Sequence, residues 1–126
     1  MVSGHGIIEL RNAISRIRSR LPYPIADPFD TRMRWAILPD GVLGRFAPIH
    51  SDTVVLSASL RDAGTDYAVS TAVHELRHRQ QYLDSPARYA ICAVPFLRRW
   101  MLEPSAVACE VEADRLIGLG GIRGAD

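Results

Sequence analysis

The strongest constraint on the fold is a change in the spacing of apolar residues near residue 64. Before this point the chain contains short runs in which apolar residues are frequent or alternate with polar ones, as in β-strands. After it, apolar residues recur every three or four positions, as on one face of an α-helix. The predicted strands are Arg32–Leu38, Val42–Ile49 and Thr53–Leu60.

The predicted helices lie on both sides of these strands. Apolar residues at helical spacing predict a first helix over about residues 6–20, which prolines 22, 24 and 28 separate from the strands. Further helices are predicted over about 65–83, from Ser85-Pro86 onwards, and from Glu103-Pro104 to the glycines after residue 117. We therefore expect an α+β fold with an N-terminal helix, a small three-stranded sheet and a helical C-terminal half.

Two local signals refine this prediction. Pro39-Asp40-Gly41 is a plausible turn and predicts that the first two strands form a hairpin. Thr65 follows Gly64 and is the candidate N-cap of the long central helix.

Size and charge exclude several classes of protein. With 126 residues, the chain is expected to form a single domain over 1–126. Fifteen basic residues, all arginines, face fourteen acidic ones, and a net charge of +1 argues against nucleic acid as a partner and against a polybasic membrane clamp.

The chain also carries no obvious membrane or export signal. The most apolar segment, Tyr89–Leu102, is interrupted by Pro95 and by Arg98 and Arg99, so we expect no membrane insertion. No stretch of signal-peptide type lies in the first thirty residues, which favours a cytoplasmic protein with two reduced cysteines. The oligomeric state is not predicted.

The main chemical feature is an HExxH sequence, His74-Glu75-Leu76-Arg77-His78, on the predicted central helix. Residues i and i+4 lie one turn apart on the same helix face, so both imidazoles can point at one metal ion. Glu75 lies beside that face, where a carboxylate can accept a proton from an activated water. The motif predicts a Zn²⁺ site with His74 and His78 as ligands and Glu75 as general base.

A third ligand is expected from the last helix, because catalytic zinc usually has three protein ligands. Glu110 and Asp114 share one face of that helix with apolar residues, where a carboxylate is costly unless it is paired or binds a metal. We favour Glu110 as third ligand, with Glu112 as the alternative and Asp114 as acceptor for the outer N–H of a ligating histidine. An acidic surface that pairs with Arg115 or with Arg98 and Arg99 is the other interpretation.

These motifs resemble those of the gluzincin zinc metallopeptidases. An HExxH helix followed by E-x-x-x-D is the pattern of that family, and Glu110-Val111-Glu112-Ala113-Asp114-Arg115-Leu116 is similar to its CAAX-prenyl-protease and stress-protease branch. The string from Val73 to Gln81 is similar to small soluble members, the minigluzincins. The resemblance covers about residues 54–118 and implies a zincin-like fold.

The resemblance also implies an activity, the hydrolysis of peptide bonds in a peptide or protein substrate. It implies that Thr53–Leu60 is an edge strand that pairs with an extended substrate. An oxyanion donor is expected, for which Tyr89 is the candidate, although packing in the core is the usual role of a single tyrosine. The alternative function is a zinc-stabilised binding or regulatory domain with little proteolytic activity, since a chain of 126 residues leaves little material for a deep cleft.

Overall fold

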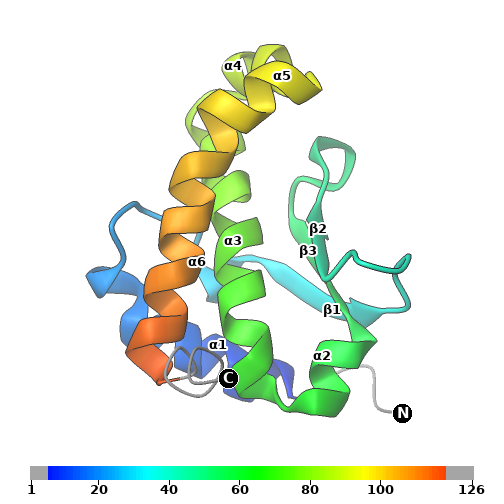
Figure 1. Ribbon diagram of the computed structural model, residues 1–126, viewed down its shortest axis with the longest axis vertical. Helices are drawn as coiled ribbons and strands as arrows, with labels where there is room; N and C mark the ends of the chain where they lie inside the picture. Colours follow the sequence, from blue (N-terminus) through cyan, green and yellow to red (C-terminus); the bar gives the residue numbers. More distant parts are fainter. Residues whose placement is uncertain (1–5, 119–126) are drawn as a thin grey trace.

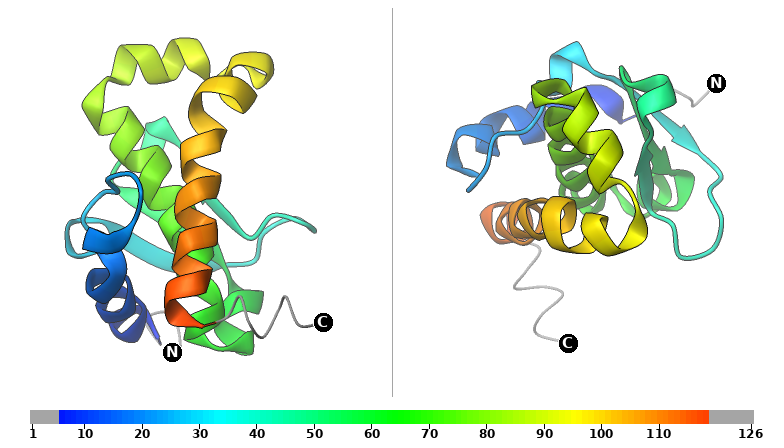
Figure 2. Two further views of the ribbon diagram at one scale, coloured as in Figure 1. Left: turned by 60° about the vertical axis from the view of Figure 1, so that its left-hand side comes forward. Right: turned by 90° about the horizontal axis from the view of Figure 1, so that it is seen from above.

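The computed structural model describes residues 6–118, and its longest element is the central helix α3 (Thr65–Asp84). The last helix, α6 (Glu103–Ile117), lies beside α3 along most of its length, as Figures 1 and 2 both show. The other helices are α1 (Ile7–Ile17), α2 (Ala58–Ala63), α4 (Pro86–Cys92), α5 (Pro95–Leu97) and the π-helical turn η4 (Arg98–Leu102). Short 3₁₀ turns are η1 (Arg18–Arg20), η2 (Pro28–Asp30) and η3 (Pro48–His50), and the strands are β1 (Arg32–Ala36), β2 (Gly44–Phe46) and β3 (Thr53–Ser57).

The predicted α+β class is confirmed, with a small three-stranded mixed sheet beside the helices (Figure 1). The strand order is β1-β3-β2, in which β1 runs parallel and β2 antiparallel to β3. The predicted hairpin between the first two strands is therefore wrong. Its turn does form, with Val42 N–H donating to the Pro39 carbonyl at 3.0 Å, but β3 lies between the two strands that the turn connects.

The third predicted strand also differs from the prediction in extent and in place. It ends at Ser57, whose side-chain oxygen accepts from the Ser59 backbone N–H and caps α2, so residues 58–60 are helical. It is the central strand of the sheet, and the edges belong to β1 and β2. The expected edge strand beside the metal helix is therefore not Thr53–Leu60.

One face of the sheet packs on the helices. The register aligns Met33 with Val54 and Trp35 with Leu56, and all four side chains are buried. Together with apolar residues of α1, α2, α3, α6 and the loop before the sheet they form a cluster, here called the main core, that consists of Ile7, Leu10, Ala13, Ile14, Ile17, Ile25, Ala26, Met33, Trp35, Val54, Leu56, Leu60, Ala68, Val69, Ala72, Val73, Leu76, Cys109 and Ala113.

Helices α4 and α5 and the turn η4 form one end of the long axis of the molecule (Figure 1). This segment, residues 86–102, is here called the cap. A second cluster of buried residues, here called the cap core, holds the cap on the rest of the molecule and consists of Phe46, Tyr89, Cys92 and Leu102. The two free cysteines, Cys92 and Cys109, are buried in different clusters.

The helix termini agree with the capping residues expected from the sequence, with one exception. Ser85 caps α4 by accepting from the Arg88 N–H, and Gly118 ends α6 in the left-handed conformation with φ of 83°. Thr65, the predicted N-cap of α3, is instead its first helical residue, because Gly64 with φ of 126° occupies the N-cap position. None of the described helices is both long enough and apolar enough to cross a membrane.

Candidate metal centre

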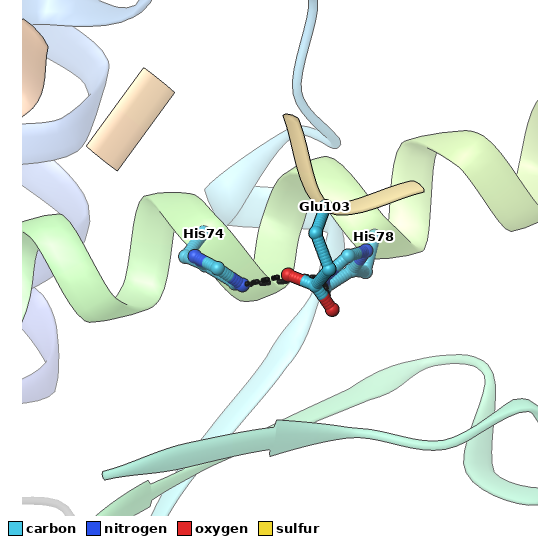
Figure 3. Close-up of side chains that lie close together, drawn as sticks. All are labelled: His74, His78 and Glu103. Atoms are coloured by element: carbon cyan, nitrogen blue, oxygen red, sulfur yellow. Dashed lines mark hydrogen bonds and ion pairs between the residues drawn. The ribbon is translucent and has the colours of Figure 1, made fainter. Parts of the chain in front are cut away.

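The two HExxH histidines project from one side of α3, and both rings lie beside the carboxylate of Glu103 (Figure 3). Their Nε2 atoms are 3.2 Å apart, which is the consequence of one helical turn between positions 74 and 78. His78 is fully buried, whereas the His74 side chain is 18% exposed. The pair therefore opens towards solvent on the His74 side.

The third group beside these nitrogens is Glu103, the first residue of α6 (Figure 3). Its Oε1 lies 3.0 Å from His74 Nε2 and 3.3 Å from His78 Nε2. A tetrahedral zinc ion with ligands at about 2.0–2.1 Å holds its ligand atoms about 3.3 Å apart. The three atoms have the spacing of one face of such a tetrahedron, so the residues present fit a zinc ion.

The outer nitrogen of each ring is held by a different acceptor. His74 Nδ1 lies 2.7 Å from Oε1 of Glu110, and His78 Nδ1 lies 2.8 Å from Oε1 of Gln81. When each Nδ1–H donates to its oxygen, the Nε2 lone pairs of both neutral rings point to the shared position. This is the tautomer that a metal ion requires.

These contacts differ from the predicted arrangement of carboxylates. Glu103, not Glu110, lies beside both Nε2 atoms, and Glu110 binds the outer nitrogen that was expected to meet Asp114. Glu112, the alternative ligand, lies away from the histidines and pairs with Arg115. Both carboxylates that contact His74 belong to the last helix, but Glu103 was not among the residues predicted from the sequence.

Glu75 is buried where α3 packs against strand β2. A Cβ at Gly44 would lie 3.1 Å from Cγ of Glu75 and 2.8 Å from Cγ2 of Thr71, so only glycine lets the strand approach the helix this closely. Burial raises the pKa of Glu75 above its usual value. A carboxyl group with a raised pKa holds a proton more readily, as a general base requires.

A groove leads from the surface to this group. It has a volume of about 330 Å³ and runs between the chain just before and within β2 and one side of α3. Its lining residues are Gly41, Val42, Leu43, Gly44, Thr71, His74, Glu75 and Glu110.

Arg98 connects the cap to the site. Its Nε donates to Oε2 of Glu103 at 2.8 Å, and its Nη1 donates to the Tyr89 hydroxyl at 3.2 Å. Tyr89, the candidate oxyanion donor, is buried in the cap core with its ring edge-on to His78 at a centroid distance of 6.4 Å. Tyr89 thus packs beside His78 in the cap core, and its hydroxyl group accepts a hydrogen bond from Arg98.

The charges of the site favour a cation. Three carboxylates, Glu75, Glu103 and Glu110, surround the histidines and are opposed by the guanidinium of Arg98. Burial on its own lowers the pKa of His74, but hydrogen bonds to Glu103 and Glu110 outweigh it and raise that pKa to about 10. The same hydrogen bonds from His74 and His78 hold the pKa of Glu103 well below its usual range. A site that binds a proton this strongly also suits a metal dication.

Three residues with clear roles in the arrangement were not selected from the sequence. The first is Glu103. The second is Gln81, whose Oε1 lies 2.8 Å from His78 Nδ1 and whose Nε2 donates to the Leu102 carbonyl at 2.9 Å, so that it joins His78 to the start of α6. Arg77 is the third: it donates to Ser105 Oγ at 2.9 Å and to the Pro24 carbonyl at 2.7 Å. The signal for Gln81 was its position three residues after His78, whereas Glu103 and Arg77 depend on contacts across the fold.

The chain was compared with models of known protein families, with curated proteins and with solved structures, and none of the three comparisons gives a match.

Proposed function

We propose that this protein is a zinc metallopeptidase in which His74, His78 and Glu103 hold the metal. The observation that carries the proposal is the convergence of three ligand atoms, at 3.0, 3.2 and 3.3 Å from one another, beside a buried glutamate. Bound zinc supplies Lewis acidity, which polarises a carbonyl group and lowers the pKa of water to about 7. The local likeness to gluzincins agrees with this chemistry.

The residues of the chain have distinct tasks in such a reaction. Glu75 accepts the proton of the attacking water and passes it to the leaving amine, for which its raised pKa is suited. Glu110 and Gln81 keep both rings in the tautomer that leaves Nε2 free. Arg98 donates to Oε2 of Glu103, which also lies 3.3 Å from His78 Nε2, and so holds this carboxylate beside the histidines.

Strand β2 is the element that we assign to substrate binding. It is an edge strand, and the groove between its start and α3 contains His74 and Glu75. An extended peptide that adds to this edge by backbone hydrogen bonds would lie along the groove. The substrate strand expected at Thr53–Leu60 is therefore reassigned to Gly44–Phe46.

The test is to measure zinc content and hydrolysis on the same samples. The wild type should bind one zinc ion and cleave a quenched fluorescent peptide library, and chelation should abolish cleavage. Glu75→Gln should retain zinc but lose cleavage by a factor of at least about 10². Cleavage retained by Glu75→Gln contradicts the assigned base, and zinc without cleavage in the wild type favours the zinc-stabilised binding domain instead.

Glu103 and Glu110 provide a matched pair for the ligand assignment, since both carboxylates lie on α6 and both contact His74. Glu110→Gln replaces the charged acceptor of the His74 Nδ1–H by a neutral amide oxygen and should weaken zinc binding by about 10–100-fold. Glu103→Gln replaces a charged ligand oxygen by a neutral amide oxygen and should weaken zinc binding further. The reverse order would return the ligand role to Glu110.

A further inference from the structure

The cap presents an unusual amount of apolar surface. Five large apolar side chains within eleven residues are 46% to 71% exposed, namely Ile91, Val94, Phe96, Trp100 and Met101. The inner side of the same segment is also apolar, because Tyr89, Cys92 and Leu102 are buried in the cap core. A helical segment that is apolar on both sides normally has a partner on its outer side.

The charges of the cap restrict what this partner can be. The segment from 85 to 102 contains three arginines and no acidic residue, a formal charge of +3. Arg98 is paired with Glu103, which leaves the exposed Arg88 and Arg99. A second copy of this chain would bring like charges together, whereas an anionic surface complements them.

The shape of the cap also suits a flat surface. It lies at one end of the long axis, so it can meet a plane without obstruction from the sheet or from α1 (Figure 1). Its helices are short, because Pro95 starts a new turn and Val94 before it is extended. They can lie in an interface but cannot cross it.

We propose that the cap binds to the surface of an anionic membrane, with Phe96 and Trp100 in the headgroup layer and Arg88 and Arg99 at the lipid phosphates. Aromatic rings favour this layer, and arginines beside them add attraction to anionic lipids. Binding of this kind leaves the chain outside the hydrocarbon layer, in agreement with the expectation that it does not insert. The proposal does not depend on the assignment of the metal centre.

The experiment is co-sedimentation of the full chain with vesicles of phosphatidylcholine, with or without phosphatidylserine. Phe96→Ser/Trp100→Ser should lower the partition coefficient on anionic vesicles by more than about tenfold. Arg88→Gln/Arg99→Gln should lower it by about tenfold, with the loss confined to anionic vesicles. The matched control is Ile37→Ser/Ile49→Ser, which removes two apolar side chains that are 96% and 84% exposed elsewhere and should change binding less than twofold.

A second measurement follows the tryptophan itself. Trp35 is buried, so in a Trp35→Phe background the emission reports on the exposed Trp100. Anionic vesicles should shift this emission to shorter wavelength, and brominated lipid should quench it. The proposal is overturned if the wild type stays in the supernatant, or if the control variant loses as much binding as Phe96→Ser/Trp100→Ser. It is also overturned if the cap substitutions abolish a dimer while vesicle binding is absent.

Discussion

The main core and the cap core differ in size and in the part of the molecule that they hold. Within residues 6–118 the main core contains nineteen buried residues from elements between α1 and α6, whereas the cap core contains four. The candidate metal centre lies between them, since Leu76 belongs to the main core and the ring of Tyr89 lies edge-on to His78. The first cluster therefore orients α3 and its histidines, and the second orients the start of α6 and Glu103.

This difference separates stability from site geometry. The main core buries more apolar surface than the cap core because it contains more residues. Most of the free energy of unfolding should therefore come from the main core. The cap core is too small to add much, but Leu102 precedes Glu103 directly and its carbonyl accepts from Gln81. Substitutions in the two clusters should have different consequences, which the following measurements test.

The largest effect is expected in the main core. Ile14→Ala removes a fully buried side chain of α1 and should lower the free energy of unfolding by about 3 kcal/mol in urea denaturation. Ile8→Ala, on the exposed side of the same helix, is the control and should cost less than about 0.5 kcal/mol. The zinc affinity of the folded protein should be the same in both, because the hydrogen-bond partners of His74, His78 and Glu103 belong to α3, η4 and α6. Equal destabilisation by the two variants would contradict the assignment of the main core.

How far the sequence predicts this fold depends on the range of the interactions. The helices at 7–17, 65–84, 86–92 and 103–117 were predicted because their signals are local, namely period, prolines and caps. The order of the strands was not, because a turn at Pro39–Gly41 does not decide which strands pair. The parallel pairing of β1 with β3 joins residues about twenty positions apart and is fixed by burial of Trp35 and Leu56 together.

The same distinction explains the outcome at the metal centre. One helical turn suffices to bring His74 and His78 together, so the motif alone predicts that pair. Glu103 and Glu110 are seven residues apart, about two turns, and therefore lie on the same side of α6. The spacing of acidic residues identifies this side of α6. It does not show which of the two glutamates lies level with the His74 and His78 Nε2 atoms, because that depends on how the cap returns the chain to α3. The π-helical turn η4, directly before Glu103, is part of that path.

The next largest effect is the pH dependence of zinc binding. Because the pKa of His74 in the metal-free protein is about 10, a proton must leave this ring before its Nε2 can bind a metal at any lower pH. Apparent zinc affinity should therefore rise about tenfold per pH unit between pH 7 and 9, rather than change only below about pH 6 as expected for an unperturbed histidine. Competition with a chelator of known pH dependence measures it.

Glu110→Gln is the control for this pH dependence. It replaces a carboxylate that raises the pKa of His74 by a neutral amide, which stabilises the charged ring less, so the rise in affinity should end at a lower pH than in the wild type. An affinity that is constant from pH 7 to 9 in the wild type would show that His74 is neutral there, against the arrangement of the carboxylates.

The smallest effect, and the one that tests the role of the cap core most directly, is expected for Leu102→Ala. Leu102 is buried with Phe46 and Tyr89, and its carbonyl accepts from the same Gln81 that holds His78. A loosened cap should displace Glu103, so zinc affinity should fall about tenfold, as for other residues that orient ligands. The free energy of unfolding should fall by less than in Ile14→Ala, since the cap core buries fewer neighbours. If Leu102→Ala lowers stability as much as Ile14→Ala and leaves zinc affinity unchanged, the two clusters form one cooperative core, and the cap does not position the metal centre independently.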